Sequence, residues 1–499
     1  MTDADKNKWW TLGAVCVATF MLLLDITIVN VALPDIAKDL KSSFSDLQWV
    51  VDAYSLGLAA LLLSAGSLAD RIGRRKVFAG GIVVFTIASL LCALSGTPFV
   101  LDLARALQGV GGAAMFATSL ALIAGAFSGR ERGTAFGIWG ATIGGAVAIG
   151  PLIGGALTQG IGWEAIFLIN LPIGILALFV TFTRVAESRD EAAPPTDIPG
   201  VVAFSGGLFL LIFALVRGNA EGWGSPLIVG FLVGAVVLLV GFVAIEARST
   251  HPMLDLALFR KPAFGGASIA AFALSASMFA MFLYLTLYIQ NTLGYKPFDA
   301  GLRFLPLSLV SFFVAPVAGR LSERVPVRWL IGGGLLLVAG ALLSMSLVDA
   351  GSAWTVLLPG FLIAGAGVGL VNAPLGSTAI QVAPPQKAGM ASGINSTFRQ
   401  VGIATGIAAY GALFQHLLAS KASGPLGRVP AEVLASGQVK LFPAAAQAQF
   451  RDIFTASLSE LFVVAAIVAC VGALLSAVLL RPRDFAPAPA AAEPEPAVA

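Results

Sequence analysis

The chain has 499 residues, of which 58% are hydrophobic and only 11% are charged, and its mean hydropathy is +0.90. A soluble domain carries about 25% charged residues, so this composition excludes an ordinary soluble protein and makes the bilayer the relevant solvent. The net charge of +3 is too small to indicate nucleic-acid binding.

Fourteen apolar runs are long enough to cross a bilayer, which takes about 20 residues. Six of them precede a polar linker, two follow it, and six more come after a charged connector over 246–261. The predicted spans are 10–32, 47–69, 77–95, 98–126, 133–158, 163–184, 200–216, 226–245, 263–290, 299–321, 329–348, 353–382, 388–415 and 455–480. We therefore predict an all-α polytopic membrane protein with 14 transmembrane helices, built as two six-helix bundles plus an inserted helix pair.

The linkers divide the chain into four predicted parts. They are an N-terminal six-helix bundle over 1–190, a linker with the two inserted helices over 191–262, a C-terminal six-helix bundle over 263–484, and a tail over 485–499. The tail is rich in Ala, Pro and Glu, which predicts disorder. One long loop is predicted, over 417–452.

Short glycine motifs recur between the two predicted bundles. Gly109-Val110-Gly111 in the fourth span returns as Gly365-Ala366-Gly367 in the twelfth. With similar recurrences in the neighbouring spans, this pattern favours two parallel repeats related by an axis along the membrane normal.

Positive charge predicts the orientation of the chain. Most of the 30 Lys and Arg residues fall in loops that face the cytoplasm if the N-terminus is inside, and short cytoplasmic loops carry such an excess. We therefore predict a multi-pass protein of the cytoplasmic (inner) membrane with both termini in the cytoplasm. The densest basic loop follows the second span, and its predicted gating residues are Gly66, Asp70, Arg71, Gly73 and Arg74.

Three ionisable side chains, Asp25, Asp52 and Arg105, lie inside predicted spans at similar depth in the outer half of the bilayer. Each costs about 2.5–3.5 kcal/mol near a helix centre, and pairing usually offsets such costs. We predict that Asp25 pairs with Arg105 and that all three residues serve proton coupling. Two alternatives stay open: a static ion pair that only locks two helices, and a solvated helix-end carboxylate at Asp52.

Polar side chains scattered through the other spans favour a cavity that is apolar with a few polar groups, the usual form of a small-molecule site. The predicted cavity residues are Asn30, Gln108, Asn170, Asn372, Asn395, Arg399 and Gln400. Because embedded carboxylates occur only in the first half, and Arg399 is the deepest charge of the second, we expect neutral or monovalent lipophilic ligands.

The fifth span contains Gly150, Pro151, Gly154 and Gly155 within six residues. Proline removes a backbone hydrogen bond and kinks a helix, and glycines permit close helix packing. We predict an outer gate at this motif; the alternative is a plain proline kink.

The sequence lacks the patterns of an enzyme. It has no Walker A motif, and its glycine-rich runs lie inside apolar spans, where they favour helix packing. The two histidines, His251 and His416, are far apart, and the three cysteines, Cys16, Cys92 and Cys470, fall within apolar runs. We predict no enzymatic activity, no cofactor and no metal, so that any work must come from an ion gradient.

Five motifs carry a family resemblance. The loop over 66–76 resembles the signature between helices two and three of the major facilitator superfamily. The segment 24–34 resembles the first-helix signature of its fourteen-helix drug:proton antiporter family, and 105–109 resembles the superfamily's fourth-helix motif, whose arginine is linked to proton transfer. Residues 150–155 resemble the fifth-helix antiporter motif, and 398–402 the thirteenth-helix motif.

This resemblance implies proton-coupled efflux of small amphipathic compounds, such as drugs or antibiotics, across the cytoplasmic membrane. The alternatives are a dedicated exporter of one metabolite, self-made antibiotic or lipid, and a receptor or scaffold that does not transport. The implied partners are a small amphipathic substrate, protons and the lipid bilayer, with no nucleic acid; an accessory export protein is left open.

Overall fold

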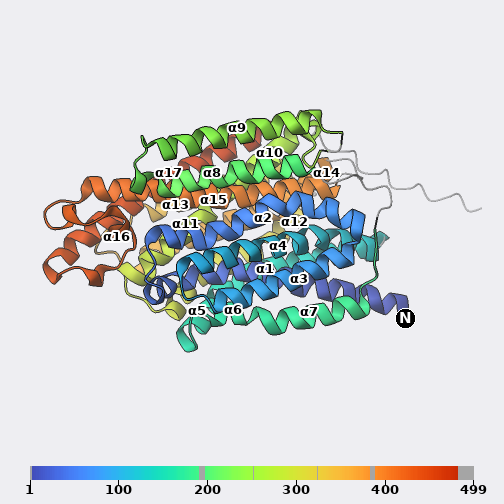
Figure 1. The fold of residues 1–499 in the computed structure, drawn as a ribbon, viewed down its shortest axis with the longest axis horizontal. Coiled ribbons are helices and arrows are strands. Elements are labelled where there is room, and N and C mark those ends of the chain that lie inside the picture. The colour runs from blue at the N-terminus through green and yellow to red at the C-terminus, as the bar shows by residue number, and fades with distance from the viewer. Residues whose placement is uncertain are drawn as a thin grey trace, which may run out of the picture.

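The computed structural model describes residues 3–127, 129–189, 197–250, 252–322, 324–382 and 388–481, and every regular element in them is helical (Figure 1). The first half contains α1 (Asp3–Asp39), α2 (Phe44–Ile72), α3 (Arg74–Ala93), α4 (Pro98–Ala126), α5 (Gly129–Gly160), α6 (Ala165–Leu168) and α7 (Asn170–Arg184). The inserted pair is α8 (Ile198–Glu221) and α9 (Pro226–Arg248). The second half contains α10 (Pro262–Leu274), α11 (Ala280–Leu287), α12 (Pro297–Leu321), α13 (Val327–Met345), α14 (Leu358–Val382), α15 (Ala388–Lys421), α16 (Ala431–Ala435) and α17 (Ala444–Leu479). Short helices η1 (Leu256–Arg260), η2 (Ser275–Phe279), η3 (Tyr288–Thr292), η4 (Trp354–Leu357), η6 (Leu426–Arg428) and η7 (Val439–Leu441) complete the described fold.

The helices account for the fourteen predicted spans. Among the described residues, twelve helices are long and apolar enough to cross a membrane, with α6–α7 and α10–η3 each forming one span. The two halves of α2, Phe44–Leu62 and Ser64–Ile72, are bent by 50° and together make a thirteenth. The fourteenth predicted span corresponds to α5, which has 32 residues and is therefore about 48 Å long at 1.5 Å per residue.

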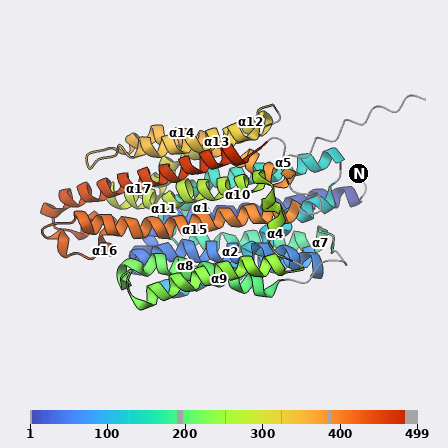
Figure 2. The same ribbon diagram turned by 90° about the horizontal axis from the view of Figure 1, so that it is seen from above.

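The helices form two groups with an inserted pair between them in sequence, as predicted. Helices α1–α7 pack on one another, and so do α10–α17. The groups meet where α2 contacts α15 and where α5 contacts α12, and α9 contacts the bundle through α8 (Figure 2). The predicted boundary at residue 190 and the predicted tail over 485–499 lie outside the described residues.

The structure corrects the long predicted loop over 417–452. Helix α15 continues to Lys421, and α17 already begins at Ala444, directly after Pro443. Alanine has the highest helix propensity, and three alanines open α17, so the helix forms before its apolar span starts. The remaining connection is itself folded, with Leu434 buried completely.

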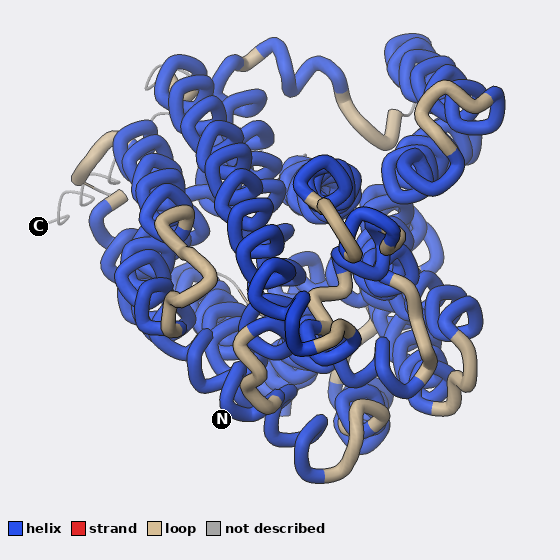
Figure 3. The backbone as a smooth tube through the Cα atoms, turned by 90° about the vertical axis from the view of Figure 1, so that its left-hand side faces the viewer, coloured by secondary structure: helices blue, strands red, loops and turns tan. Residues whose placement is uncertain are grey.

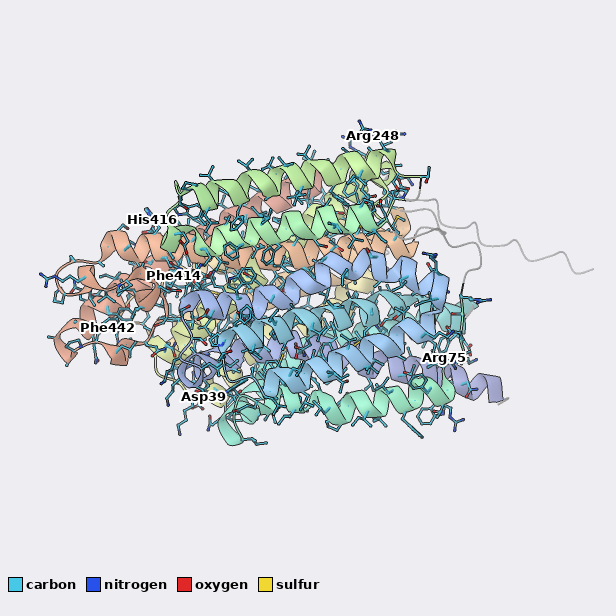
Figure 4. The ribbon with its side chains drawn as sticks, viewed as in Figure 1. Asp39, Arg75, Arg248, Phe414, His416 and Phe442 are labelled. Atoms are coloured by element: carbon cyan, nitrogen blue, oxygen red, sulfur yellow. The ribbon has the colours of Figure 1, made fainter. Side chains whose placement is uncertain are left out.

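The two ends of the molecule differ. Arg75 and Arg248 mark one end, which we call the Arg75 end, and Asp39 and Phe442 mark the other, the Phe442 end (Figure 4). The N-terminus lies at the Arg75 end. Figure 3 looks onto the Phe442 end, where many helices are seen nearly end-on and are joined by loops.

Candidate functional site

Asp25 on α1 and Arg105 on α4 form a buried ion pair. Nη1 of Arg105 lies 2.5 Å from Oδ2 of Asp25, and the two side chains are 1% and 0% exposed. Nε of Arg105 donates to the carbonyl oxygen of Val50 on α2 over 3.0 Å. The guanidinium also lies over the ring of Tyr54, 4.4 Å from its centroid. The pair therefore joins α1, α2 and α4 inside the first half.

Polar side chains from α3, α4 and α7 complete the environment of Asp25. Its Oδ1 accepts from Nε2 of Gln108 over 2.8 Å and from Nδ2 of Asn170 over 3.2 Å. Both amides also donate to Oγ of Ser89 on α3, at 2.9 and 3.2 Å. Oε1 of Gln108 accepts in turn from Arg105. Three donors thus converge on one carboxylate, an arrangement that stabilises its ionised form.

The predicted positions of Gln108 and Asn170 are therefore wrong for this conformation. Both were predicted to line a central cavity, but each is 0% exposed and sits within the first half, against Asp25. Ser89 was missed, because a single serine in an apolar helix gives no signal unless the helix is known to face a charge.

Asp52 on α2 is the third predicted proton-coupling residue, and its surroundings differ from those of Asp25. The side chain is 0% exposed, and neither carboxylate oxygen has a hydrogen-bond partner in the described part of the chain. Asp102 of α4 and Tyr284 of α11 lie close enough to interact with it electrostatically. The expected alternative of a solvated helix-end carboxylate is thus wrong for this conformation.

A small cavity lies between the two halves near Asn30 on α1. Its volume is about 30 Å³, and Thr27 and Pro151 line it from the first half. Phenylalanine rings, among them those of Phe282 and Phe304, line it from the second half. Sites for drug-sized ligands measure about 300–1,000 Å³, so this mainly apolar cavity is too small to hold such a ligand in this conformation.

The predicted cavity residues of the second half lie in separate places. Nη1 of Arg399 donates to Oδ1 of Asn372 over 2.9 Å, so an amide partners this arginine. Nδ2 of Asn395 donates to the carbonyl oxygen of Ala267 on α10 over 3.2 Å. Gln400 faces α2 and α8 in a different part of the interface. In this conformation the seven predicted residues do not form one site.

The basic loop between α2 and α3 is held by carboxylates. Asp70 pairs with Arg74 over 2.8 Å, at the start of α3. Gly73 between them has φ +118°, a conformation that favours glycine, and a side chain there would strike Glu187. Glu187, which was not predicted, accepts from the backbone N–H of Arg75 over 3.0 Å. The loop is thus fixed to the segment that follows α7.

For the other two predicted gating residues of this loop, no such contact is found among the described residues. Arg71 is exposed. A Cβ added at Gly66 would meet no atom within 4 Å. No other helix therefore packs closely against Gly66 in the described part of this conformation.

The glycines around Pro151 form the contact face of α5. A Cβ on Gly154 would lie 2.9 Å from Cα of Ile28 on α1. A Cβ on Gly150 would collide with Oγ1 of Thr27 on α1, and one on Gly155 would strike the first turn of α12. The carbonyl oxygen of Pro151 itself abuts Gly301 of α12. The motif therefore closes the interface between the two halves on the α5–α12 side.

Substituting Gly155 by alanine should weaken this interface. The new Cβ would lie 2.5 Å from the carbonyl oxygen of Pro297 and 2.7 Å from Cα of Phe298. We expect the free energy of unfolding to fall by about 1–3 kcal/mol, the usual effect of overpacking. Gly160→Ala on the same helix is the matched control, because no atom lies within 4 Å of its Cβ position. Thermal unfolding in detergent measures both; an equal change in the two variants would contradict the assignment.

Two helical halves packed around a shared interface, with a buried charge pair in one of them, are typical of secondary membrane transporters. The chain belongs to the Major Facilitator Superfamily, whose family model matches residues 15–407. It is 37% identical to the tetracenomycin C resistance and export protein of Streptomyces glaucescens, over 82% of this chain and 76% of that protein. It is 39% identical to a puromycin resistance protein of Streptomyces alboniger, over 81% of each chain.

Two further comparisons agree with this family. The multidrug resistance protein Stp of Mycobacterium tuberculosis is 38% identical over 82% of this chain and 76% of its own. Among solved structures, a bacterial homologue of the human lysosomal transporter Spinster, in an inward-facing and occupied conformation, superposes with a TM-score of 0.67. Its sequence identity is 16%, over 96% of this chain and 98% of that one, so this likeness concerns the fold.

Proposed function

We propose that the protein exports small amphipathic compounds from the cytoplasm in exchange for protons. The buried pair of Asp25 and Arg105 supports coupling most directly, because ionisable groups inside a membrane domain mark ion pathways and proton relays. The names of the relatives support export, since they are resistance and export proteins for tetracenomycin C, puromycin and several drugs.

The two carboxylates hold different charge states in this proposal. Asp25 is ionised, because Arg105, Gln108 and Asn170 all donate to it. Asp52 carries the proton, because an ionised carboxylate buried without a partner is very costly. The small cavity near Asn30 fits a proton-loaded state without bound substrate.

The exchange follows from the movement of the two halves. When they separate on the cytoplasmic side, water reaches Asp52, which loses its proton, and substrate occupies the widened cavity. A shift of Arg105 away from Asp25 in another state would let Asp25 bind a proton as well. Proton and substrate must each differ in affinity between the two states, or neither can drive the other.

The orientation is part of the proposal, and labelling tests it. We expect a cysteine at Ser67, near the Arg75 end, to resist an impermeant thiol reagent in intact cells, because basic loops stay cytoplasmic. Ser420→Cys, on an exposed site near the other end of the molecule, should react quickly. Both variants carry Cys470→Ala, which removes an exposed thiol. Rapid reaction at position 67 with none at 420 would reverse the orientation.

Export of one dedicated compound is the second candidate function. It is favoured by relatives named for a single antibiotic, such as the probable actinorhodin transporter of Streptomyces coelicolor, which is 36% identical to this chain. The same site would serve both functions, and the breadth of the substrate range separates them.

Energised inside-out membrane vesicles test the proposed function. Compounds are added one at a time while a fluorescent dye reports the interior pH, with puromycin, tetracenomycin C and matched mono- and divalent quaternary ammonium ions in the panel. We expect neutral and monovalent compounds to release interior protons, with little response to dications, because the cavity is largely apolar. A response to one compound alone would favour the dedicated exporter, and no response to any would contradict proton exchange.

A further inference from the structure

The two halves meet along two lengthwise seams, which are not covered alike. Helix α8 packs against both α2 and α15, so it lies across the seam between them, and Figures 1 and 2 both show it beside these helices. Along the other seam, α5 packs directly on α12. Within the described residues, α1 packs extensively on α5 and touches α12 only slightly, and more than half of its span is buried inside the protein.

Apolar side chains fill the junction of α8 with the α2–α15 seam. Ile212 and Val216 of α8 are 0% and 2% exposed. The cluster that buries them contains Ala404 and Ala408 of α15 together with Trp49, Leu56 and Leu215. The ring of Trp49 on α2 also lies 5.9 Å from that of Phe209 and 6.1 Å from that of Phe213. Small alanines on α15 thus let α8 sit deep in the seam.

The seam beneath α8 contains polar groups that lipid would not tolerate. Ser55 of α2 and Gln400 of α15 are 3% and 7% exposed, and Oε1 of Gln400 lacks a hydrogen-bond partner in the described chain. Leu208 and Ile212 of α8 close the space around them so tightly that it does not admit a water molecule. Polar groups exposed to hydrocarbon cost several kcal/mol, so the seam needs a cover.

The attachment of α8 to the two halves is unequal. Nδ2 of Asn219 on α8 donates to the carbonyl oxygen of Ala412 on α15 over 2.6 Å. Toward α2, the contacts that fix α8 are apolar, through Trp49 and Leu56. Apolar surfaces slide past one another more readily than a hydrogen-bonded pair separates, because no directional partner is lost.

We propose that α8 is a lateral seal that moves with the second half, slides over α2 as the halves rock, and keeps the α2–α15 seam closed to the bilayer. Compounds dissolved in the membrane then reach the interface on the uncovered α5–α12 side. The proposal assigns this role to the inserted helix pair and rests on the alternating access of the proposed function.

Two matched cross-links from one position on α8 test the movement. Leu208→Cys is combined either with Thr405→Cys on α15 or with Leu56→Cys on α2, since all three residues line the same small space. Both proteins carry Cys16→Ala and Cys470→Ala, and Cys92 is kept because it is buried. A short bifunctional methanethiosulfonate links each pair, and a reductant reverses the link.

We expect the α8–α15 link to leave export within about twofold of the unlinked protein, and the α8–α2 link to reduce it by at least about tenfold until reductant is added. Export that stops with the α8–α15 link, or continues with the α8–α2 link, overturns the proposal. Export by the unlinked proteins is measured first: if it is absent, the proposed function fails, and the seal is judged on lipid access alone.

Lipid access is measured without transport. An apolar aryl diazirine dissolved in the membranes is photolysed, and mass spectrometry locates the labelled residues. We expect Val236 on α9, which is 62% exposed, to be labelled strongly and Ser55 to Ala59 on α2 hardly at all. Leu208→Ala with Ile212→Ala should raise α2 labelling by on the order of tenfold, because truncation loosens the packing. Equal labelling of α2 and α9 in the unmodified protein would show that α8 is not a seal.

Discussion

Replacing Arg105 by alanine should abolish export and lower the free energy of unfolding by about 3–5 kcal/mol, because one partner of a buried pair is left uncompensated. In the structure Arg105 is 1% exposed, pairs with Asp25 and also donates to the carbonyl oxygen of Val50. Its loss therefore removes contacts between three helices as well as a charge. Thermal unfolding in detergent and drug export by cells report the two effects.

The double variant Asp25→Asn with Arg105→Gln separates stability from coupling. Removing both charges leaves no unpaired ion, so we expect most of the lost stability to return. Export against a gradient should stay absent, since the titratable group is gone. Full export by the double variant would mean that the pair only locks α1 to α4.

Asp52→Asn should have the second largest effect on transport, with little effect on folding. The amide keeps the volume of the side chain, and neither oxygen of Asp52 makes a hydrogen bond to the described residues that would be lost. We expect the free energy of unfolding to change by less than about 1 kcal/mol. Accumulation driven by a pH gradient should disappear, because the proton that this carboxyl carries has no replacement.

Asp102→Asn is the matched control for this variant. Asp102 is the neighbouring carboxylate on α4 and is only half-buried, near the start of its helix. We expect it to keep coupled export, because its side chain is partly exposed in this conformation, although Oδ1 itself is buried without a hydrogen-bond partner in the described residues. Loss of coupling at Asp102 but not at Asp52 would move the proton site to α4.

Hydropathy was sufficient to predict the fourteen spans and their grouping, because each apolar run must lie in the bilayer whatever it packs against. The ends of helices were less predictable. The early start of α17 at Ala444 depends on alanine propensity and on packing of the connection, where the ring of Phe442 stacks on that of Phe450, and hydropathy does not register this packing.

The ion pair was predictable, and its surroundings were not. Depth in the membrane placed Asp25 near Arg105, and the cost of isolated charges favoured their pairing. Which amides join them depends on how each helix is rotated about its axis, so Gln108 and Asn170 were assigned to a cavity rather than to Asp25. The burial of Asp52 and the contacts of Ser89 were unpredictable for the same reason, because both depend on side chains of neighbouring helices.

Proteoliposomes containing the purified protein provide the most direct measurement of the central claim, proton coupling through Asp25. An imposed pH gradient is used to drive substrate accumulation, and exchange of labelled for unlabelled substrate is followed separately at equal pH. For Asp25→Asn we predict that exchange continues while accumulation against the substrate gradient is lost. Accumulation by Asp25→Asn equal to that of the unmodified protein would contradict the account, because coupling would then need no proton binding at Asp25 and Asp52 alone would suffice.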